Sequence, residues 1–176
     1  MAITISGSGI TSANIADGTI VNADINSSAA IDGNKLTGAG KVLQVVQGTY
    51  STSVTSSTST LIDTGLTATI TPSSATSKIL CIFHQNGVVV NNNTDVHLTL
   101  LRSGVTIHRP SRWDFYTAST LQQRGQISST YLDSPAATTA LVYKSMFASG
   151  ENVADTRVQY NGSDTVSTIT LMEIAQ

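Results

Sequence analysis

Residues 10–36 read ITSANIADGTIVNADINSSAAIDGNKL, and this stretch sets the organisation of the chain. An aliphatic side chain returns at about every fifth position, at Ile10, Ile15, Ile20, Ile25, Ile31 and Leu36. A helix repeats near 3.6 residues and a half-buried strand at 2, so neither period fits. The Asn, Asp and Gly residues between the aliphatics favour turns. We therefore expect a chain that turns once per repeat and presents one aliphatic side chain each time.

A single copy of this repeat cannot bury its own aliphatic stripe, and exposure would forfeit roughly 1.5–3 kcal/mol per side chain. Either three copies wind around a common axis, or the stripe docks on another protein. A single-chain pentapeptide-repeat coil is a third interpretation, suggested by Ala-Asn-Ile at 13–15 and Ala-Asp-Ile at 23–25. Such a coil needs several stacked turns to form a core, and this stretch supplies too few. The stripe therefore predicts an assembly protein, in the first case a homotrimer.

From residue 41 onward the pattern is typical of strands. Eight to ten short strands at regular spacing predict an antiparallel β-sandwich of the jelly-roll kind. The run KILCIFH at 78–84 is apolar at both alternating positions, which predicts a central strand covered on both faces. Asn161-Gly162 predicts a hairpin turn. The clearest expected strands are 42–50, 66–70, 78–84, 96–102, 105–108, 125–132, 141–147, 156–160 and 166–174.

Length and pattern together predict two parts. Residues 1–40 form an arm and a pentad-repeat base for trimerisation and anchoring, and residues 41–176 form the β-sandwich knob. The glycines at 38 and 40 make a hinge between them, because glycine permits any backbone turn.

Composition excludes several classes of protein. The chain has 176 residues, 11% charged residues and a net charge of −2, so no basic patch indicates nucleic acid. No run approaches the length of a membrane span, and no signal peptide is visible. The single cysteine, Cys81, excludes an internal disulfide framework and is expected to be a buried small hydrophobe. We expect synthesis in a host cytoplasm.

Several phrases resemble one family. The start MAITISGSG and the following GTIVNADINSSAAIDGNKLTG resemble the N-terminal segments of tailed-phage fibre and virion surface proteins. ITPSSATSKILCIFH, YLDSPAATTALVYK and VSTITLMEI are similar to the β-rich knob that follows such segments. The resemblance implies a trimer with a jelly-roll-like head on a narrow base, and it brings no catalytic residues. The chain lacks the extended shaft and the large tail-docking domain of a long tail fibre.

The sequence gives little support for a catalytic site or a metal site. His84, His97 and His108 lie on different expected strands without Cys or carboxylate at ligand spacing, although His97 and His108 could face each other across the turn at 103–104. No G-x-S-x-G accompanies the many serines. The carboxylates that could form a hydrolytic pair sit mostly in expected turns: Asp95, Asp114, Asp133, Glu151, Asp155 and Asp164. We expect no enzyme activity, no metal and no cofactor.

The best candidate contact surface lies in residues 109–124, the longest segment without clear periodicity. It holds the only Trp and a group of arginines, and both residue types dominate interface hot spots. The same mixture could stack on a host-surface glycan or pack against a sister subunit. The candidate residues are Arg109, Arg112, Trp113, Phe115 and Tyr116.

From these expectations we infer a virion surface protein, and two hypotheses for its role compete. In the first, it is a capsid decoration or cement protein whose base is seated on the major capsid protein. In the second, it is a short tail fibre or receptor-binding knob attached to a tail protein. About 27 residues of base reach at most roughly 90 Å, which favours a stubby decoration protein. A bacterial lectin-like module ranks last, because no secretion signal is visible.

Overall fold

The computed structural model describes residues 41–176 except 92, 117–120 and 151–153. The predicted base and its stripe, Ile10, Ile15, Ile20, Ile25, Ile31 and Leu36, lie outside the described residues. The part that is described is all-β, and every strand pair in it is antiparallel. The all-β class with antiparallel sheets, predicted for residues 41–176, is thereby confirmed for the described residues.

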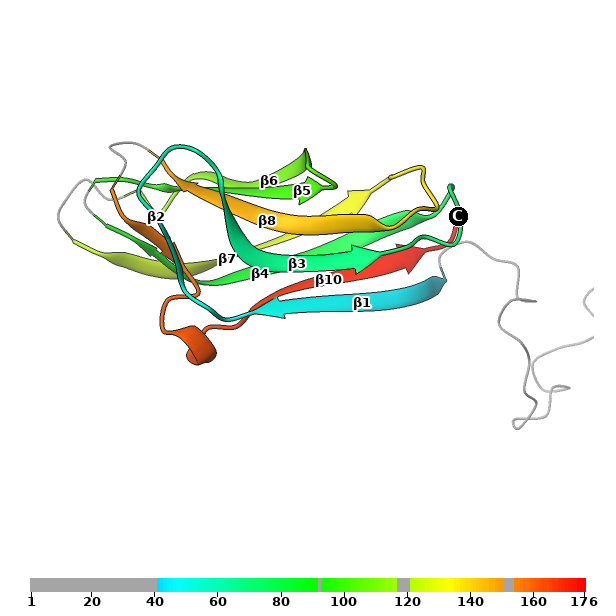
Figure 1. Ribbon diagram of the computed structural model, residues 1–176, viewed down its shortest axis with the longest axis horizontal. Coiled ribbons are helices and arrows are strands. Elements are labelled where there is room, and N and C mark those ends of the chain that lie inside the picture. The colour runs from blue at the N-terminus through cyan, green and yellow to red at the C-terminus, as the bar shows by residue number, and fades with distance from the viewer. Residues whose placement is uncertain (1–40, 92, 117–120, 151–153) are drawn as a thin grey trace, which may run out of the picture. The chain divides into compact units, whose positions relative to one another are not determined.

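The strands form two sheets that lie over one another as two layers (Figure 1). The six-stranded sheet has the order β1, β10, β4, β9, β2, and β7 pairs with the other side of β4. Its strands are β1 (Val42–Tyr50), β10 (Ser167–Ile174), β4 (Lys78–Val90), β9 (Thr156–Val158), β2 (Val54–Ser56) and β7 (Gln123–Asp133). The four-stranded sheet has the order β3 (Ile62–Ile70), β8 (Leu141–Ser149), β5 (Val96–Arg102) and β6 (Val105–Asp114).

The core lies between the two sheets, because each strand turns alternate side chains inward. In β10 the residues Ile169 and Leu171 are fully buried, and their neighbours Thr168, Thr170 and Met172 face outward and are half-buried. Both sheets contribute large side chains, among them Phe83 from β4 and Phe147 from β8. Alternation that hides one face of each sheet is what holds a sandwich together.

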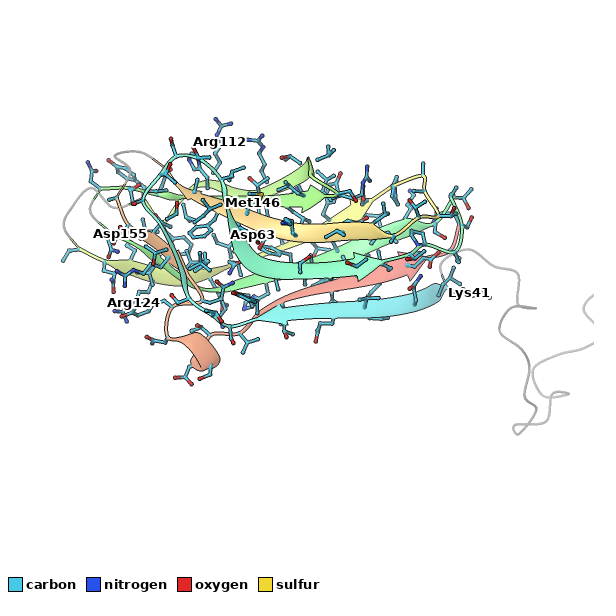
Figure 2. All side chains as sticks on the ribbon, in the orientation of Figure 1. Lys41, Asp63, Arg112, Arg124, Met146 and Asp155 are labelled. Carbon is cyan, nitrogen blue, oxygen red and sulfur yellow. The ribbon has the colours of Figure 1, made fainter. Side chains whose placement is uncertain are left out.

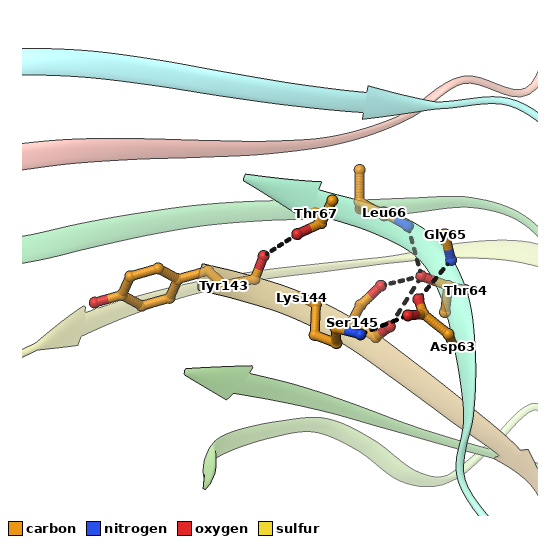
Figure 3. Close-up of polar contacts among 8 residues, drawn as sticks. All are labelled: Asp63, Thr64, Gly65, Leu66, Thr67, Tyr143, Lys144 and Ser145. Carbon is orange, nitrogen blue, oxygen red and sulfur yellow. Dashed lines mark hydrogen bonds and ion pairs between the residues drawn. The ribbon is translucent and has the colours of Figure 1, made fainter. Parts of the chain in front are cut away.

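A bulge in β3 shapes the edge of the four-stranded sheet. The register against β8 shifts between Asp63 and Thr67, and Gly65 lies at φ 85°. The Asp63 carboxylate accepts the Gly65 N–H at 2.8 Å, and the Thr64 hydroxyl accepts the Leu66 N–H at 3.1 Å (Figure 3). A Cβ at position 65 would collide with the Tyr50 ring, so the positive φ and the close contact both require glycine here.

An ionic clamp joins the ends of the two sheets. Arg102, at the end of β5, donates from one nitrogen to both carboxylate oxygens of Asp133, at the end of β7, at 2.7 Å each. The Tyr143 hydroxyl of β8 donates to the same carboxylate at 2.7 Å. Burial first, then the hydrogen bond to Asp133, raises the pKa of Tyr143, so the hydroxyl stays a donor. The carboxylate of Asp133, only 4% exposed, thus has its partners.

A buried polar network crosses the core, where the sequence pattern predicts none. The Gln85 amide donates to the Ser167 hydroxyl at 2.9 Å and accepts from the Ser145 hydroxyl at 3.3 Å. Ser145 also bonds to Thr64, and Gln159 donates to Ser167 at 3.2 Å. These side chains connect β10 and β4 of one sheet to β8 and β3 of the other. Hydrogen bonds of this kind between buried side chains favour one specific arrangement of the sheets, although the Gln159 Oε1 has no hydrogen-bond partner among the described residues.

Three predictions need correction. The run 78–84 is a central strand as predicted, but within one chain only one face is covered, because Ile82 is 43% exposed on the other. Asn161-Gly162 makes a turn with the short 3₁₀ segment Gly162–Asp164, yet β9 and β10 do not pair as a hairpin, since each lies beside β4. The segment 109–124 includes the ends of two strands, because β6 runs to Asp114 and β7 begins at Gln123.

Candidate functional site

Two of the predicted contact residues, Arg109 and Arg112, lie on β6, the edge strand of the four-stranded sheet. Leu98 and Leu100 of β5 pair with Ser111 and His108, so three steps along β6 oppose two along β5. A second shift follows between Val96 and Leu98. Such bulges re-aim side chains and are common at sheet edges. Pro110 fits here because an edge strand need not donate every N–H.

The two arginines flank a small pocket on the outer face of this sheet. The pocket has a volume of about 190 Å³. Thr99 and Ser111 lie in its floor and are 3% and 4% exposed. The rest of the lining comes from His97, Ala148 and two residues of the β2–β3 connection, Ser59 and Leu61. Figure 2 shows Arg112 extending from β6 away from the sandwich.

The imidazole of His97 lies close to a buried carboxylate. Asp95 is fully buried, and its Oδ2 lies 3.5 Å from the Nε2 of His97. A Cβ at position 150 would fall on this carboxylate, 1.2 Å from Oδ1, so Gly150 leaves the space that Asp95 occupies.

The chemistry available at the pocket is cationic and hydrogen-bonding. Arg109 is exposed, and none of the described residues forms an ion pair with its guanidinium. The Ser111 hydroxyl donates to the Val96 carbonyl at 3.0 Å and is therefore committed to the sheet. Thr99, in contrast, brings a hydroxyl to the floor of the pocket. A guanidinium beside a hydroxyl suits an anionic group that carries further oxygens.

The remaining members of the predicted contact set do not join this pocket. Phe115 packs against the core, and its ring occupies the space that a side chain at Gly125 would need. Tyr116 is exposed, and its hydroxyl donates to the Asn93 amide oxygen at 2.5 Å. Trp113 belongs to β6 by its backbone, and its side chain lies outside what the structure describes. The predicted set is therefore divided rather than gathered in one loop.

The three histidines are also separated. The idea that His97 and His108 face each other is wrong, because the register shift between Leu100 and Leu101 pairs His108 with the inward-facing Leu100, whereas His97 lies on the outer face. His108 points inward, contacts the Ser129 hydroxyl at 2.7 Å and stacks on Tyr131 with ring centroids 5.0 Å apart. His84 is on the outer face of the other sheet and bonds to Ser128. Among the described residues, no group of three or more His, Cys, Asp or Glu could hold a metal ion.

The other residues considered as catalytic candidates lie in structural surroundings, in ion pairs, in turns or in the core. Asp133 is in the ionic clamp, Asp155 lies 3.6 Å from Arg157, and Asp164 is exposed in the 3₁₀ segment. The side chains of Asp114 and Glu151 lie outside the described residues. Burial above all, with the Asp133 carboxylate adding to it, raises the pKa of the Cys81 thiol to about 12. Cys81 is fully buried, as predicted.

A second feature, which was not among the predicted sites, is the outer face of the six-stranded sheet. Strand register aligns its outward side chains in rows across β1, β10, β4 and β7. The rows are Val45, Met172, Leu80 and Leu132, then Gln47, Thr170, Ile82 and Thr130, then Thr49, Thr168, His84 and Ser128. They contain no Asp, Glu, Lys or Arg. Val45 is 57% exposed and Leu132 is 50% exposed, so the first of these rows is apolar; beyond it, the next outward position on β4 is Lys78, which pairs with Ile174.

Comparison of the chain with known protein families and with curated protein sequences finds no match. Within the described residues, no helix has the length and apolar character needed to span a membrane.

Proposed function

We propose that this protein is a non-enzymatic, homotrimeric structural protein of a phage virion that decorates the capsid surface. The observation that carries the proposal is the set of three uncharged rows on the outer face of the six-stranded sheet. In a single chain Val45, Ile82 and Leu132 are about half exposed; Val45 and Leu132 end the first row, with Met172 and Leu80 between them, and Ile82 lies in the second row. A contiguous apolar patch on a sheet marks an interaction surface.

The partner that we propose for this face is a second copy of the chain. Identical subunits carry identical charges, so a face that meets its own copy must avoid like-charge contacts. The three rows satisfy this condition, because Gln, Thr, Ser and His surround the aliphatic side chains without a carboxylate, an amine or a guanidinium. Depletion of charge in the core of the contact is what distinguishes protein interfaces from the rest of the surface.

The position of this face in the sequence fits the same partner. The aliphatic stripe ends at Leu36, and β1 begins at Val42. Three chains that share an axis through their stripes would therefore bring their β1 strands together. Leu43 and Val45 of β1 are exposed aliphatic side chains.

We also propose that the sandwich is a jelly roll. The order β1, β10, β4, β7 over β3, β8, β5, β6 supports this topology. The chain passes to the opposite sheet from β3 to β4, from β4 to β5, from β6 to β7 and from β7 to β8. Eight strands wound between two sheets in this way make the double Greek key that viral capsid domains use.

Two sites of attachment compete. In the preferred role the base, residues 1–40, binds the major capsid protein, and the short reach of a 27-residue stripe, at most roughly 90 Å, supports it. A short tail fibre or receptor-binding knob is the second candidate. The pocket beside Arg109 favours it, since a receptor-binding knob needs a ligand site on its surface.

The copy number of this chain in purified virions tests the role. Quantitative mass spectrometry should find hundreds of copies per virion if the protein decorates the capsid. A few to a few dozen copies would instead indicate a tail appendage, and absence from virions would overturn both roles. Light scattering during size-exclusion chromatography tests the trimer separately, and it should report about three times the chain mass of 18.4 kDa.

A further inference from the structure

We propose that the pocket between Arg109 and the β2–β3 connection binds the carboxylate of an acidic sugar. This inference rests on the pocket alone and stands whether or not the protein belongs to a virion. Its lining combines three kinds of group in one small space: guanidinium, hydroxyl and aliphatic. Each kind matches a different part of a uronic or sialic acid residue.

The charge in the pocket selects an anion. Arg109 and Arg112 both line the pocket, each from beside a bulge of β6. A guanidinium offers its N–H groups in a fixed fork, which fits the two oxygens of a carboxylate. The buried Asp95 carboxylate lies beneath His97 and is not part of the pocket lining. Among the described residues, the side chains that line the pocket are therefore cationic or neutral.

The floor and one wall favour a sugar over a bare anion. Thr99 can bond a ring hydroxyl, and Leu61 and Ala148 offer apolar surface to the C–H face of a pyranose. At about 190 Å³ the pocket is smaller than the ~300 Å³ of typical ligand sites, so it would hold one residue of a longer glycan. Ser59 and Leu61 come from the β2–β3 connection, which closes the pocket over the sheet.

Nuclear magnetic resonance titration of the full-length protein with three probes tests the inference. Galacturonic acid should shift the signals of Arg109 and Thr99 and saturate. Its methyl ester, which keeps the ring but carries a neutral ester with an added methyl group in place of the carboxylate, should bind at least about tenfold more weakly, because charge-assisted hydrogen bonds are worth more than neutral ones. Acetate should also bind more weakly than galacturonic acid, since it lacks the ring.

Two substitutions assign the binding to the pocket. Arg109→Gln keeps a polar side chain of similar reach but removes the charge, and it should weaken galacturonic acid binding by about tenfold or more. Thr99→Val should weaken galacturonic acid binding and leave acetate binding unchanged. The matched control is Arg124→Gln: Arg124 is also exposed, but it lies over the Tyr160 ring, 4.9 Å from its centroid, and does not line the pocket. It should bind as the unaltered protein does.

Three outcomes would overturn the inference. Equal affinity for the acid and its methyl ester would show that charge is not recognised. Equal affinity for acetate and galacturonic acid would reduce the pocket to a carboxylate site without a sugar. Unchanged binding in Arg109→Gln, with loss of binding in Arg124→Gln, would place the ligand elsewhere.

Discussion

The two outer faces of the sandwich are built from different residues although the same chain makes both. Three rows across the six-stranded sheet carry no Asp, Glu, Lys or Arg and leave Val45 and Leu132 in the open. The four-stranded sheet instead carries Arg109 beside its pocket and an exposed ion pair between Lys144 and Asp63. Charged groups are well solvated in water, but burying them in a contact between identical subunits costs free energy through desolvation and repulsion. The difference separates a face for association from a face for solvent and ligands.

The largest expected effect comes from placing a charge on the association face. Ile82 is 43% exposed at the centre of the second row. Ile82→Lys would bring an ammonium group from each subunit into the contact, at a cost on the order of several kcal/mol for desolvation and repulsion. Sedimentation velocity should show a monomer where the unaltered protein shows a trimer, and the chain should remain folded.

A matched control lies on the opposite sheet. Val142 of β8 is 38% exposed, faces outward from the four-stranded sheet and has β propensity similar to that of Ile82. Val142→Lys should leave the trimer intact. If both variants dissociate, or if neither does, the two faces do not differ in the way proposed.

The next largest expected effect concerns the ionic clamp, which joins the two sheets that carry these faces. Arg102→Leu leaves the Asp133 carboxylate buried with Tyr143 as its remaining donor. Removing one partner of a buried pair costs more than the pair contributes, and we expect a loss of about 2–4 kcal/mol in the free energy of unfolding. Urea denaturation followed by circular dichroism measures it.

Removing the second charge should restore stability. With Arg102→Leu and Asp133→Asn together, the Tyr143 hydroxyl keeps an acceptor and no charge is left unpaired. The double variant should recover at least half of the loss. A double variant less stable than the single one would show that the clamp stabilises through its charges rather than through satisfied hydrogen bonds.

The strands were the part of the fold that could be predicted. Val42–Tyr50 and Val96–Arg102 were placed to the residue, because apolar side chains recur there and turn formers mark the ends. Pairing across the sandwich could not be predicted, since it depends on contacts between residues far apart in sequence. The sequence also does not show what packs on each face of a strand, and for this reason the run 78–84 was predicted to be covered on both faces.

The pocket was predictable only in part. Residue type alone indicates the arginines of residues 109–112, but no strand pattern is visible there, because three register shifts and Pro110 interrupt the alternation of β6. Nothing local connects Arg109 with Ser59 and Leu61, some fifty residues earlier in the chain, as pocket partners. The pairing of Gln85 with Ser167 in the core was equally hidden, because polar residues are expected at the surface.

The smallest predicted effect concerns two carboxylates in different surroundings, a buried one in the six-stranded sheet and an exposed one in the four-stranded sheet. Glu173 of β10 points inward and is fully buried. It accepts hydrogen bonds from the Gln44 amide at 2.6 Å and from the backbone and hydroxyl of Ser73 at 2.8 and 2.7 Å. Burial alone would raise the pKa of Glu173, but these hydrogen bonds outweigh it and lower the pKa to about 2. Asp63 is instead exposed and paired with Lys144 at 2.6 Å.

Because folding lowers the pKa of Glu173, the unfolded chain binds its proton at a higher pH than the folded chain does. The stabilisation is therefore complete above about pH 4.5 and is lost as the pH falls toward 2. Glu173→Gln should remove about 2–3 kcal/mol at neutral pH and flatten the pH dependence in that window. Asp63→Asn should cost at most about 1 kcal/mol, as exposed ion pairs contribute little. Thermal unfolding from pH 2 to 7 measures both, and an equal pH dependence in the two variants would contradict the contrast between a hidden and an exposed carboxylate.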